Sequence, residues 1–443
     1  MKYIKKGIQD IKVTVIVTVH NAEKYLRECL ESVTSQTLKD IEILCIDGGS
    51  TDHSPEILQE YADRDSRIRI INDKNTSYGH KVNEGIRQAE GEYISVLESD
   101  DMYQADMLKK LYGIVEKYKP DYVNADYFNF YDINEKRYQA LVKMYDNEDY
   151  GKLLKSEDSL KNMKQILRYW TGIFRKDFLI RNEIRMNESP GASFQDMSFR
   201  FLTSALAETA YHMEIPVYLY RIDNPGSSVY DAKKSVVIAD EFDFLKKELI
   251  NRKIEDSHIW RHYYTWKYND FHGNLIRFGS AERKVLFERC YKELEKDRTA
   301  LKEIDEQLYS EVITALLTKT EEEMWDRIDE IYNMNQKRIA WFRDSVWNLA
   351  ENGIVVFGCG MYGRSVLDYL KAMGMEKEIY CLADNAEELW NSKLENYSIL
   401  PPEQAVSRFS RACYIVAVKY ARDEICRQLR EYGIDEPQIS IFQ

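Results

Sequence analysis

Short apolar runs alternate with amphipathic stretches along the N-terminal part of the chain. Residues 13–19 (VTVIVTV), 41–46 (IEILCI) and 93–97 (YISVL) are almost wholly apolar, which predicts strands buried on both faces. Residues 21–36 place leucine and valine at helical spacing, and Asn21 is suited to cap that helix. Strand and helix alternate about every 25 residues, which predicts βαβ units and a parallel sheet.

Polar residues follow three of the predicted strands. They stand in the stretches VHN (19–21), DGGSTD (47–52) and ESDD (98–101). Because parallel sheets bind ligands at the carboxyl ends of their strands, we expect the three loops to form one site. The alternative is that these are ordinary turn residues, since Asp, Gly, Ser and Asn commonly fill turns. Three such loops on one edge favour the site.

Three carboxylates crowd the end of one predicted strand: Glu98, Asp100 and Asp101. Carboxylates placed together repel one another and resist desolvation. A hard divalent cation, Mg²⁺ or Mn²⁺, would offset that repulsion and bridge a carboxylate to a diphosphate. The sequence therefore predicts a metal-held diphosphate, as in a nucleotide-activated donor.

The chain changes character twice after the first sheet. Residues 121–230 mix aromatic-rich segments, whereas residues 231–345 are charged, with apolar residues every three or four positions, which predicts helices. From residue 354 strand and helix alternate again. We therefore expect an α/β protein in three parts: an α/β domain at 1–230, a helical region at 231–345 and a small parallel α/β domain at 346–443.

The first domain resembles a known family. The segments that carry the resemblance are VTVIVTVHNAEKYLRECLESVTSQT (13–37), IEILCIDGGSTDHSPEIL (41–58) and NEGIRQAEGEYISVLESDD (83–101), continued by WTGIFRKDFL (170–179), FQDMSFRFL (194–202) and YRIDNPGSSV (220–229). In order and spacing they are similar to the family-2 glycosyltransferases of the GT-A fold, over about half the chain. The resemblance implies an inverting, metal-dependent transfer of a sugar from a nucleoside-diphosphate sugar to a hydroxyl acceptor.

The resemblance also implies roles for single residues. Asp196 falls on the family's catalytic base, which would take the proton of the acceptor hydroxyl while an oxocarbenium-like transition state forms. The alternative for Asp196 is a helix N-cap. Asp100 and Glu98 fall on the metal-binding motif. The expected donor-binding residues are Thr18, His20, Asn21, Asp47, Gly48, Lys81, Asn83, Ser99 and Asp100.

The chain departs from the family pattern at several of these positions. Gly48 stands where the family often has a second aspartate that reads the base, so the resemblance leaves the base open. Glu98 replaces the first aspartate of the metal-binding motif and keeps its charge. Val82 stands where a basic residue often precedes the asparagine matched by Asn83, so either His80 or Lys81 would approach the diphosphate instead.

A glycine loop in the C-terminal part raises a second candidate site. Gly358, Gly360 and Gly363 form a GxGxxG between a predicted strand and a predicted helix, and Asp384 ends the next strand. This pattern is typical of dinucleotide sites, and the segment resembles Rossmann-like units appended to sugar-modifying enzymes. Two readings stay open: a site for a nucleotide or NAD, or a structural, regulatory or assembly module.

Composition limits the kind of ligand and the cellular compartment that we expect. A net charge of −13 argues against a general nucleic-acid binder. The chain has seven cysteines without a CxxC pair and no run of 18 apolar residues, so we expect a cytoplasmic protein without a membrane span. Contact with the cytoplasmic face of a membrane and homodimerisation stay open.

The sequence thus favours a glycosyltransferase of cell-surface polysaccharide or glycan synthesis, with a glycan or lipid-linked acceptor. Two alternatives remain at this point. One is an NAD-dependent sugar-nucleotide oxidoreductase or epimerase that acts through the C-terminal domain. The other is a non-catalytic nucleotide-sugar-binding scaffold.

Overall fold

The computed structural model forms two compact units. It describes residues 10–133, 135–155, 166–227, 236–277, 280–303, 320–347, 349–418 and 421–442. The first unit contains residues 1–128 and 142–328, and the second contains residues 129–141 and 329–443. The boundary expected at residue 230 lies outside the described residues, and the three-part division stays a prediction.

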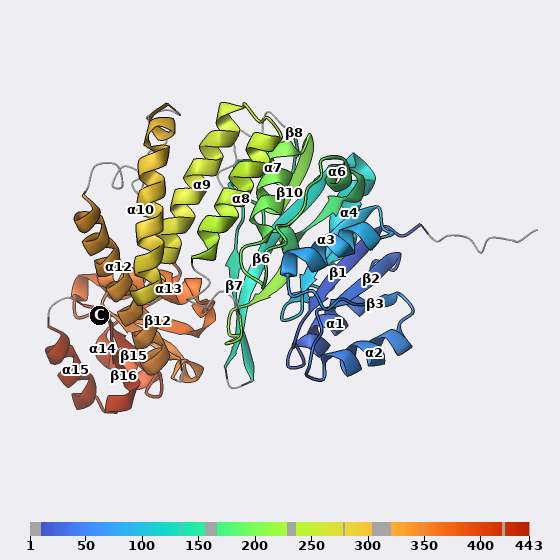
Figure 1. The fold of residues 1–443 in the computed structure, drawn as a ribbon. Helices are drawn as coiled ribbons and strands as arrows, with labels where there is room; N and C mark the ends of the chain where they lie inside the picture. The colour runs from blue at the N-terminus through green and yellow to red at the C-terminus, as the bar shows by residue number, and fades with distance from the viewer. Residues whose placement is uncertain are drawn as a thin grey trace, which may run out of the picture. The chain divides into compact units, whose positions relative to one another are not determined.

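A large mixed sheet organises the first unit (Figure 1). Its strands are β1 (Val13–Val19), β2 (Ile41–Asp47), β3 (Ile68–Asn72), β4 (Tyr93–Glu98), β5 (Met102–Tyr103), β6 (Tyr122–Ile133), β7 (Lys136–Val142), β8 (Leu153–Lys155), β9 (Gly172–Arg175) and β10 (Thr209–Arg221). The main path runs β3-β2-β1-β4-β9-β6-β10-β5, with β7 on β6 and β8 on β10. Strands β3, β2, β1 and β4 are parallel, which confirms the expected βαβ arrangement.

Helices flank this sheet. They are α1 (Leu26–Thr34), α2 (Ser54–Arg64), α3 (Tyr78–Gln88), α4 (Met107–Tyr118), α6 (Lys176–Arg181) and α7 (Asp196–Leu206). Every residue of β1 and β2 is buried, as their apolar runs predict. One local prediction is wrong: Asn21 does not cap α1, because the helix begins at Leu26 and Asn21 adopts a left-handed φ of 51°.

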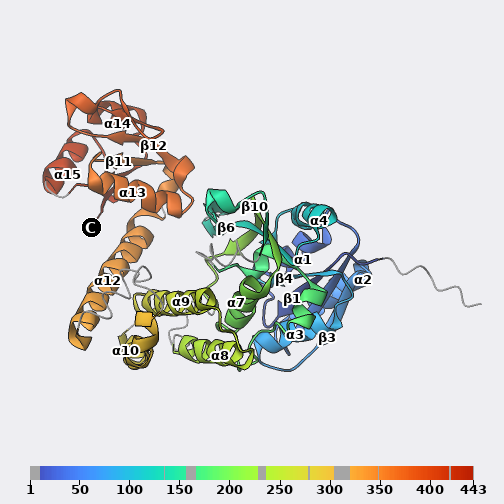
Figure 2. The ribbon, with the colours of Figure 1, turned by 90° about the horizontal axis from the view of Figure 1, so that it is seen from above.

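The helical region contains α8 (Val237–Asn251), α9 (Ser257–Leu275), α10 (Ser280–Glu303) and α12 (Glu321–Trp341). Helices α7, α8 and α9 lie side by side (Figures 1 and 2). A buried cation, Lys267, ties α9 to α10 through Glu293 and Asp297, each at 2.8 Å. Lys246 of α8 joins the same Asp297 at 2.9 Å, so buried charges fix three helices in register.

A smaller mixed sheet lies in the second unit. Its elements are β11 (Ile354–Phe357), α13 (Met361–Ala372), β12 (Ile379–Ala383), β13 (Lys393–Leu394), β14 (Tyr397–Leu400), α14 (Pro402–Arg408), β15 (Cys413–Val416), α15 (Arg422–Glu431) and β16 (Ile439–Ile441). The strand order is β13-β14-β12-β11-β15-β16, and only the β13–β14 pair is antiparallel. The tip of the β6–β7 hairpin belongs to this unit, where Tyr131 stacks on Trp347 and donates to Met373 O at 2.6 Å.

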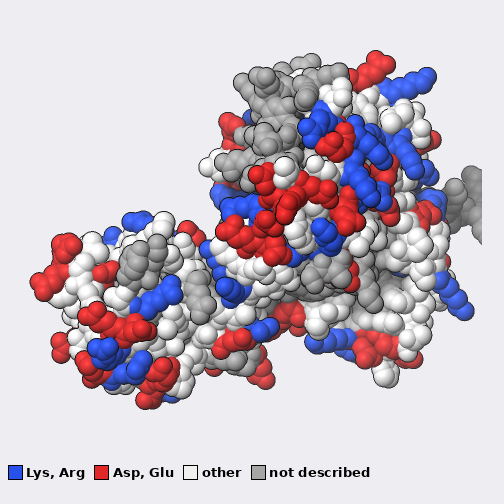
Figure 3. Space-filling model, turned by 60° about the vertical axis from the view of Figure 1, so that its left-hand side comes forward, with Lys and Arg blue, Asp and Glu red and all other residues white. Residues whose placement is uncertain are grey.

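Three further features concern the cysteines, the apolar character of the helices and the surface charge. All seven cysteines are buried and unpaired. None of the described helices is long and apolar enough to cross a bilayer. On the face shown in Figure 3, acidic side chains form a dense group with basic side chains beside it.

Candidate active site at the carboxyl edge of the large sheet

Strands β1, β2 and β4 bring the predicted polar positions to one edge. In register, Val19 pairs with Asp47 and Thr18 pairs with Glu98. The hydroxyl of Thr18 lies 3.4 Å from Glu98 Oε2. The structure therefore gathers three of the residues expected at the site on adjacent strand ends, as the convergence of the loops predicts.

The loops after β1 and β2 hold each other. Asn21 Oδ1 accepts from Thr51 N at 2.8 Å, and Asn21 N donates to Ser50 Oγ at 2.9 Å. Ser50 in turn donates its hydroxyl to Asp47 Oδ1 at 2.6 Å. Asp47 is thus fixed by a chain of hydrogen bonds, whereas His20 is exposed at the rim. The left-handed backbone of Asn21 turns the first loop toward the second.

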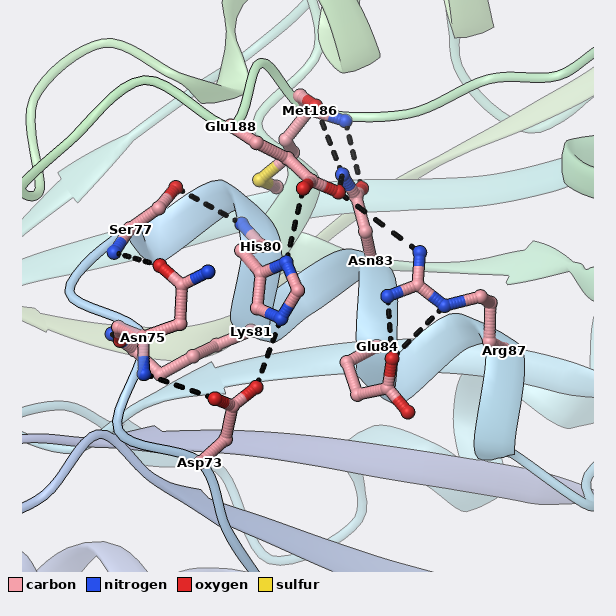
Figure 4. Close-up of polar contacts among 10 residues, drawn as sticks. All are labelled: Asp73, Asn75, Ser77, His80, Lys81, Asn83, Glu84, Arg87, Met186 and Glu188. Carbon is pink, nitrogen blue, oxygen red and sulfur yellow. Dashed lines mark hydrogen bonds and ion pairs between the residues drawn. The ribbon is translucent and has the colours of Figure 1, made fainter.

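Of the two basic candidates on α3, Lys81 is the one beside the sheet edge. Its Nζ lies 3.0 Å from the position that a β-carbon on Gly48 would take. Burial lowers the pKa of this ammonium, and the negative charges of Asp73, Asp47 and Glu98 oppose that shift. His80 is engaged elsewhere: its ring lies between Asp73 and Glu188 (Figure 4).

Two tyrosine hydroxyls bind the carboxylate of Glu98. Tyr169, in a short 3₁₀ turn before β9, donates to Glu98 Oε1 at 2.5 Å, and Tyr78 at the start of α3 donates to the same oxygen. Burial raises the pKa of Glu98 to about 7, the two hydroxyls oppose this, and the charges of Asp100 and Asp196 add to it. Glu98 therefore lies within electrostatic reach of both aspartates.

The other two carboxylates have partners within the protein. Asp101 is buried and accepts from Tyr218 OH at 2.8 Å and from Arg221 N at 2.7 Å. Asp100 Oδ2 accepts from Asn224 at 2.7 Å, and its backbone carbonyl accepts from Arg221 Nε at 3.0 Å. Part of the positive charge expected at this edge is thus the Arg221 guanidinium. Arg221 stands in YRIDNPGSSV (220–229), one of the segments that carry the family resemblance, but the sequence alone assigns it no role.

Asp196 is the first residue of α7, and the preceding residue, Gln195, is the N-cap. The Asp196 side chain does not cap the helix but pairs through Oδ2 with Arg200 Nη1 at 3.0 Å. Arg200 also donates to Leu167 O at 2.8 Å, so its guanidinium is held from two directions. The negative charge of Asp196 contributes to the raised pKa of Glu98, Tyr78 and Tyr169, so this carboxylate acts electrostatically on all three groups.

Two further donor-binding candidates differ in their surroundings. Ser99 is half-buried in the turn between Glu98 and Asp100. Asn83 is buried, and its amide is occupied by Met186 and Glu188 (Figure 4). In this structure Asn83 therefore holds protein backbone, a partner that the sequence pattern did not indicate.

The carboxylates at this edge fit a divalent cation whose remaining ligands come from a bound substrate and water. Within the described ranges, no group of three or more His, Cys, Asp or Glu side chains forms a ready-made metal site. Mg²⁺ in particular needs only one or two carboxylates when substrate phosphates and water supply the other ligands. Glu98 and Asp100 offer two such hard oxygen donors at the sheet edge.

In the second unit, the side chain of Asp384 accepts a hydrogen bond from the backbone of the glycine loop. Gly358 has a left-handed φ of 113°, and a β-carbon on Gly363 would lie 1.9 Å from Gly358 O. Asp384 accepts from Cys359 N at 2.8 Å and from Ala386 N at 2.9 Å. Gly360 caps α13 and has open space around it. The predicted residues therefore meet, and Asp384 holds the loop itself.

The parallel strands of this mixed sheet carry carboxylates and polar loops at their carboxyl ends, the edge at which α/β sheets bind ligands. Residues 14–181 match the family described as glycosyl transferase family 2. Residues 350–440 match a second family, described as C2185-like, N-terminal.

Several relatives are glycosyltransferases by name. Glycosyltransferase GlyA of Streptococcus pneumoniae is 30% identical over 219 residues, which cover 48% of this chain and 31% of that protein. The putative glycosyltransferase EpsH of Bacillus subtilis is 29% identical over 221 residues, 47% of this chain and 60% of that protein. The chain therefore spans less than two thirds of the length of these relatives.

Solved structures show the same fold. S. aureus TarS 1–349, in complex with UDP and with UDP-GlcNAc, aligns with a TM-score of 0.52 and 16% identity. Each alignment covers 73% of this chain and 92% of that one. The expected GT-A-type fold of the first domain is thus confirmed.

Proposed function

We propose that this protein is a metal-dependent, inverting glycosyltransferase that uses a nucleoside-diphosphate sugar. The observation that carries the proposal is the meeting of Thr18, Asp47 and Glu98 at one sheet edge, with Asp196 within electrostatic reach of Glu98. The family of the domain and the UDP complexes of TarS support a nucleotide-sugar donor.

In the proposed reaction Asp196 accepts the proton of the acceptor hydroxyl as that oxygen attacks the anomeric carbon. The new C–O bond forms on the face opposite the leaving group, and the bond from the anomeric carbon to the diphosphate oxygen breaks. The nucleoside diphosphate leaves with the electron pair. Arg200 Nη1, at 3.0 Å from Asp196 Oδ2, orients that carboxylate.

The donor diphosphate would meet two kinds of group at this edge. Lys81 supplies a buried ammonium, which gains a partner when an anion arrives. Glu98 and Asp100 are the residues that would hold Mg²⁺ or Mn²⁺, which supplies charge neutralisation of the departing diphosphate when bound. Asp47 and Thr18 line the same edge, where the nucleoside would lie.

The acceptor we propose is a hydroxyl of a cell-surface glycan or a lipid-linked glycan. The base stays open, because Gly48 offers no side chain to read it. Uracil is the first base to test, since TarS was solved with UDP.

A thermal-shift screen tests the proposal. The purified chain is melted with UDP, GDP, CDP, ADP, dTDP, UDP-GlcNAc or NAD, each with MnCl₂, MgCl₂ or EDTA, because a ligand of the native state raises the melting temperature. We expect a metal-dependent rise with one nucleotide, lost in Asp100→Ala and kept in Asp63→Ala. Asp63 is an exposed aspartate on α2 that serves as the matched control.

Two outcomes would contradict the proposal. A rise with NAD alone, insensitive to metal and to Asp100, would move the chemistry to the glycine loop at Gly358. No rise in melting temperature with any nucleotide, together with no release of nucleoside diphosphate from the corresponding nucleotide sugars, would rule out the proposed transferase activity.

A further inference from the structure

The first turns of α3 hold residues 186–195, the stretch that leads into Asp196. Asn83 Nδ2 donates to Met186 O at 3.0 Å, and Met186 N donates to Asn83 Oδ1 at 2.9 Å. The side-chain amide therefore pairs with the backbone of Met186 as a neighbouring strand would. Both atoms of the amide are used in this pairing, and Asn83 is 4% exposed.

A charged bridge lies one turn earlier on the same helix (Figure 4). His80 Nδ1 lies 3.0 Å from Glu188 Oε2, and His80 Nε2 lies 2.9 Å from Asp73 Oδ2. In its imidazolium form the ring can donate to both carboxylates, and the hydrogen bond to Glu188 raises the pKa of His80. Glu188 Oε1 accepts in addition from Asn83 at 3.0 Å. Glu188 is thus held by two residues of α3.

The backbone of the segment also packs directly on the helix. Tyr78 N donates to Gly191 O at 2.8 Å. A β-carbon on Gly79 would lie 1.9 Å from Asn187 O, so only glycine permits this approach. The start of α3 is therefore shaped to receive residues 186–195.

Helix α8 grips the same stretch from another direction. The carboxylate of Glu241 accepts from Asn187 Nδ2 at 3.0 and 3.1 Å and from Ser189 Oγ at 2.7 Å. Within the stretch, Gln195 donates to Ser189 O at 3.3 Å and to Gly191 O at 3.1 Å. The residue just before Asp196 is thereby joined to the part of the segment that α3 and α8 hold.

We propose that His80 and Asn83 are positioning residues, which act through Glu188 and Met186 to hold residues 186–195 and so keep Asp196 beside Glu98. This inference rests on the proposed function only for the role of Asp196; the clamp itself rests on the contacts. It gives a different task to Asn83, which was expected to bind the donor, and to His80, which was one of two candidates for approaching the diphosphate. The other charged groups near the bridge are Lys81, Glu84 and Arg87, the last 3.9 Å from Glu188.

Hydrogen exchange and nucleotide affinity together test the clamp. In His80→Gln and in Glu188→Gln, we expect amide exchange of residues 187–195 to rise about tenfold, the effect of losing one charge-assisted hydrogen bond. Affinity for the Mn²⁺ complex of the nucleoside diphosphate that most stabilises the wild-type chain should stay within about twofold, because the clamp does not touch the donor. Glu188 is half-exposed, so its variant should fold.

Turnover separates positioning from donor binding. With the matching nucleotide sugar, release of nucleoside diphosphate should show a lower kcat with an unchanged KM in both variants. His53→Gln is the matched control, because His53 pairs with Glu23 at 2.7 Å in the same unit, away from residues 186–195. It should change neither exchange of the segment nor kcat.

The contrary results are distinct. Weaker nucleotide binding with unchanged exchange would make His80 a donor ligand and overturn the inference, as would unchanged exchange alone. If the wild-type chain binds no nucleotide, the proposed function fails, yet the exchange of residues 187–195 still decides whether the clamp exists.

Discussion

The ammonium nitrogen of Lys81 lies 3.0 Å from the place where a β-carbon on Gly48 would stand. The lysine is 5% exposed, and its Nζ lies 3.4 Å from Asn75 O. A cation from α3 thus occupies the neighbourhood of a position that has no side chain. Because the two positions are adjacent, a side chain introduced at Gly48 should reveal whether the Lys81 ammonium binds an anion.

Gly48→Asp should be tolerated and should weaken anion binding. The new carboxylate would meet the flexible end of Lys81 and neutralise it, so the melting temperature should hold or rise while affinity for the nucleoside diphosphate falls about tenfold. Gly48→Val places the same β-carbon 3.3 Å from Val19 O but brings no charge to pair with Lys81, so it should lower the melting temperature. Equal affinity in Gly48→Asp and the wild type would show that Lys81 does not bind the diphosphate.

Arg221→Ala should destabilise the first unit. The guanidinium is 4% exposed, pairs with Glu28 at 2.6 Å and donates to Asp100 O. Its removal would take a charge-assisted hydrogen bond from the half-exposed Glu28 and another from the Asp100 carbonyl, at a cost of about 2 kcal/mol in the free energy of unfolding. Urea denaturation measures this directly, and Arg27→Ala, which breaks an exposed pair with Glu60, should cost much less stability.

Asp196→Asn should remove catalysis while leaving the fold and donor binding intact. Asn can still accept from Arg200, so we expect little change in melting temperature. Loss of a general base lowers kcat by about 10²- to 10⁴-fold. Release of nucleoside diphosphate and nucleotide titration measure the two effects separately. A variant that retains full turnover would require a different base.

Glu241→Gln should stabilise the protein at alkaline pH more than at acidic pH. Burial raises the pKa of this carboxyl from 4.5 to about 7, so its favourable contribution is complete below its unfolded pKa and is lost as the pH rises through 7. Glutamine avoids that loss, with a gain of about 2 kcal/mol above pH 8 and little below pH 4.5. Thermal melts across pH test this, with the exposed Glu255→Gln as control.

Gly363→Ala should destabilise the second unit although it lies in a helix. Alanine normally favours a helix over glycine by about 1 kcal/mol, but here its β-carbon would stand 1.9 Å from Gly358 O. We expect a loss of about 2 kcal/mol or more in unfolding free energy. Gly360→Ala, with open space around the position, should be nearly neutral. Equal stability of the two variants would contradict the close packing.

The parallel strands and their polar ends could be predicted because short apolar runs and turn residues are local signals. The pairing of Thr18 with Glu98 follows from the position of β4 beside β1, an order that the sequence pattern did not predict. Partners across the fold left no local signal. Nothing near Glu98 indicates that Tyr78 and Tyr169 share one of its oxygens.

Asn83 shows the same limit from the other side. The family resemblance implied a donor ligand at this position, whereas the fold brings Met186 to its amide from about a hundred residues away. Asn21 failed as a helix cap because the chain first turns back toward Ser50 and Thr51. The local sequence pattern thus predicted the sheet edge and the types of residue on it. Long-range packing determines the hydrogen-bond partner of each residue.

The buried thiols make the chain a reporter of its own opening. Cys29, Cys45 and Cys290 lie in the first unit, and Cys359, Cys381, Cys413 and Cys426 lie in the second. An alkylating reagent reaches a buried thiol only when its surroundings open. Mass spectrometry of alkylated peptides would therefore time the unfolding of each unit within one sample, without any engineered cysteine.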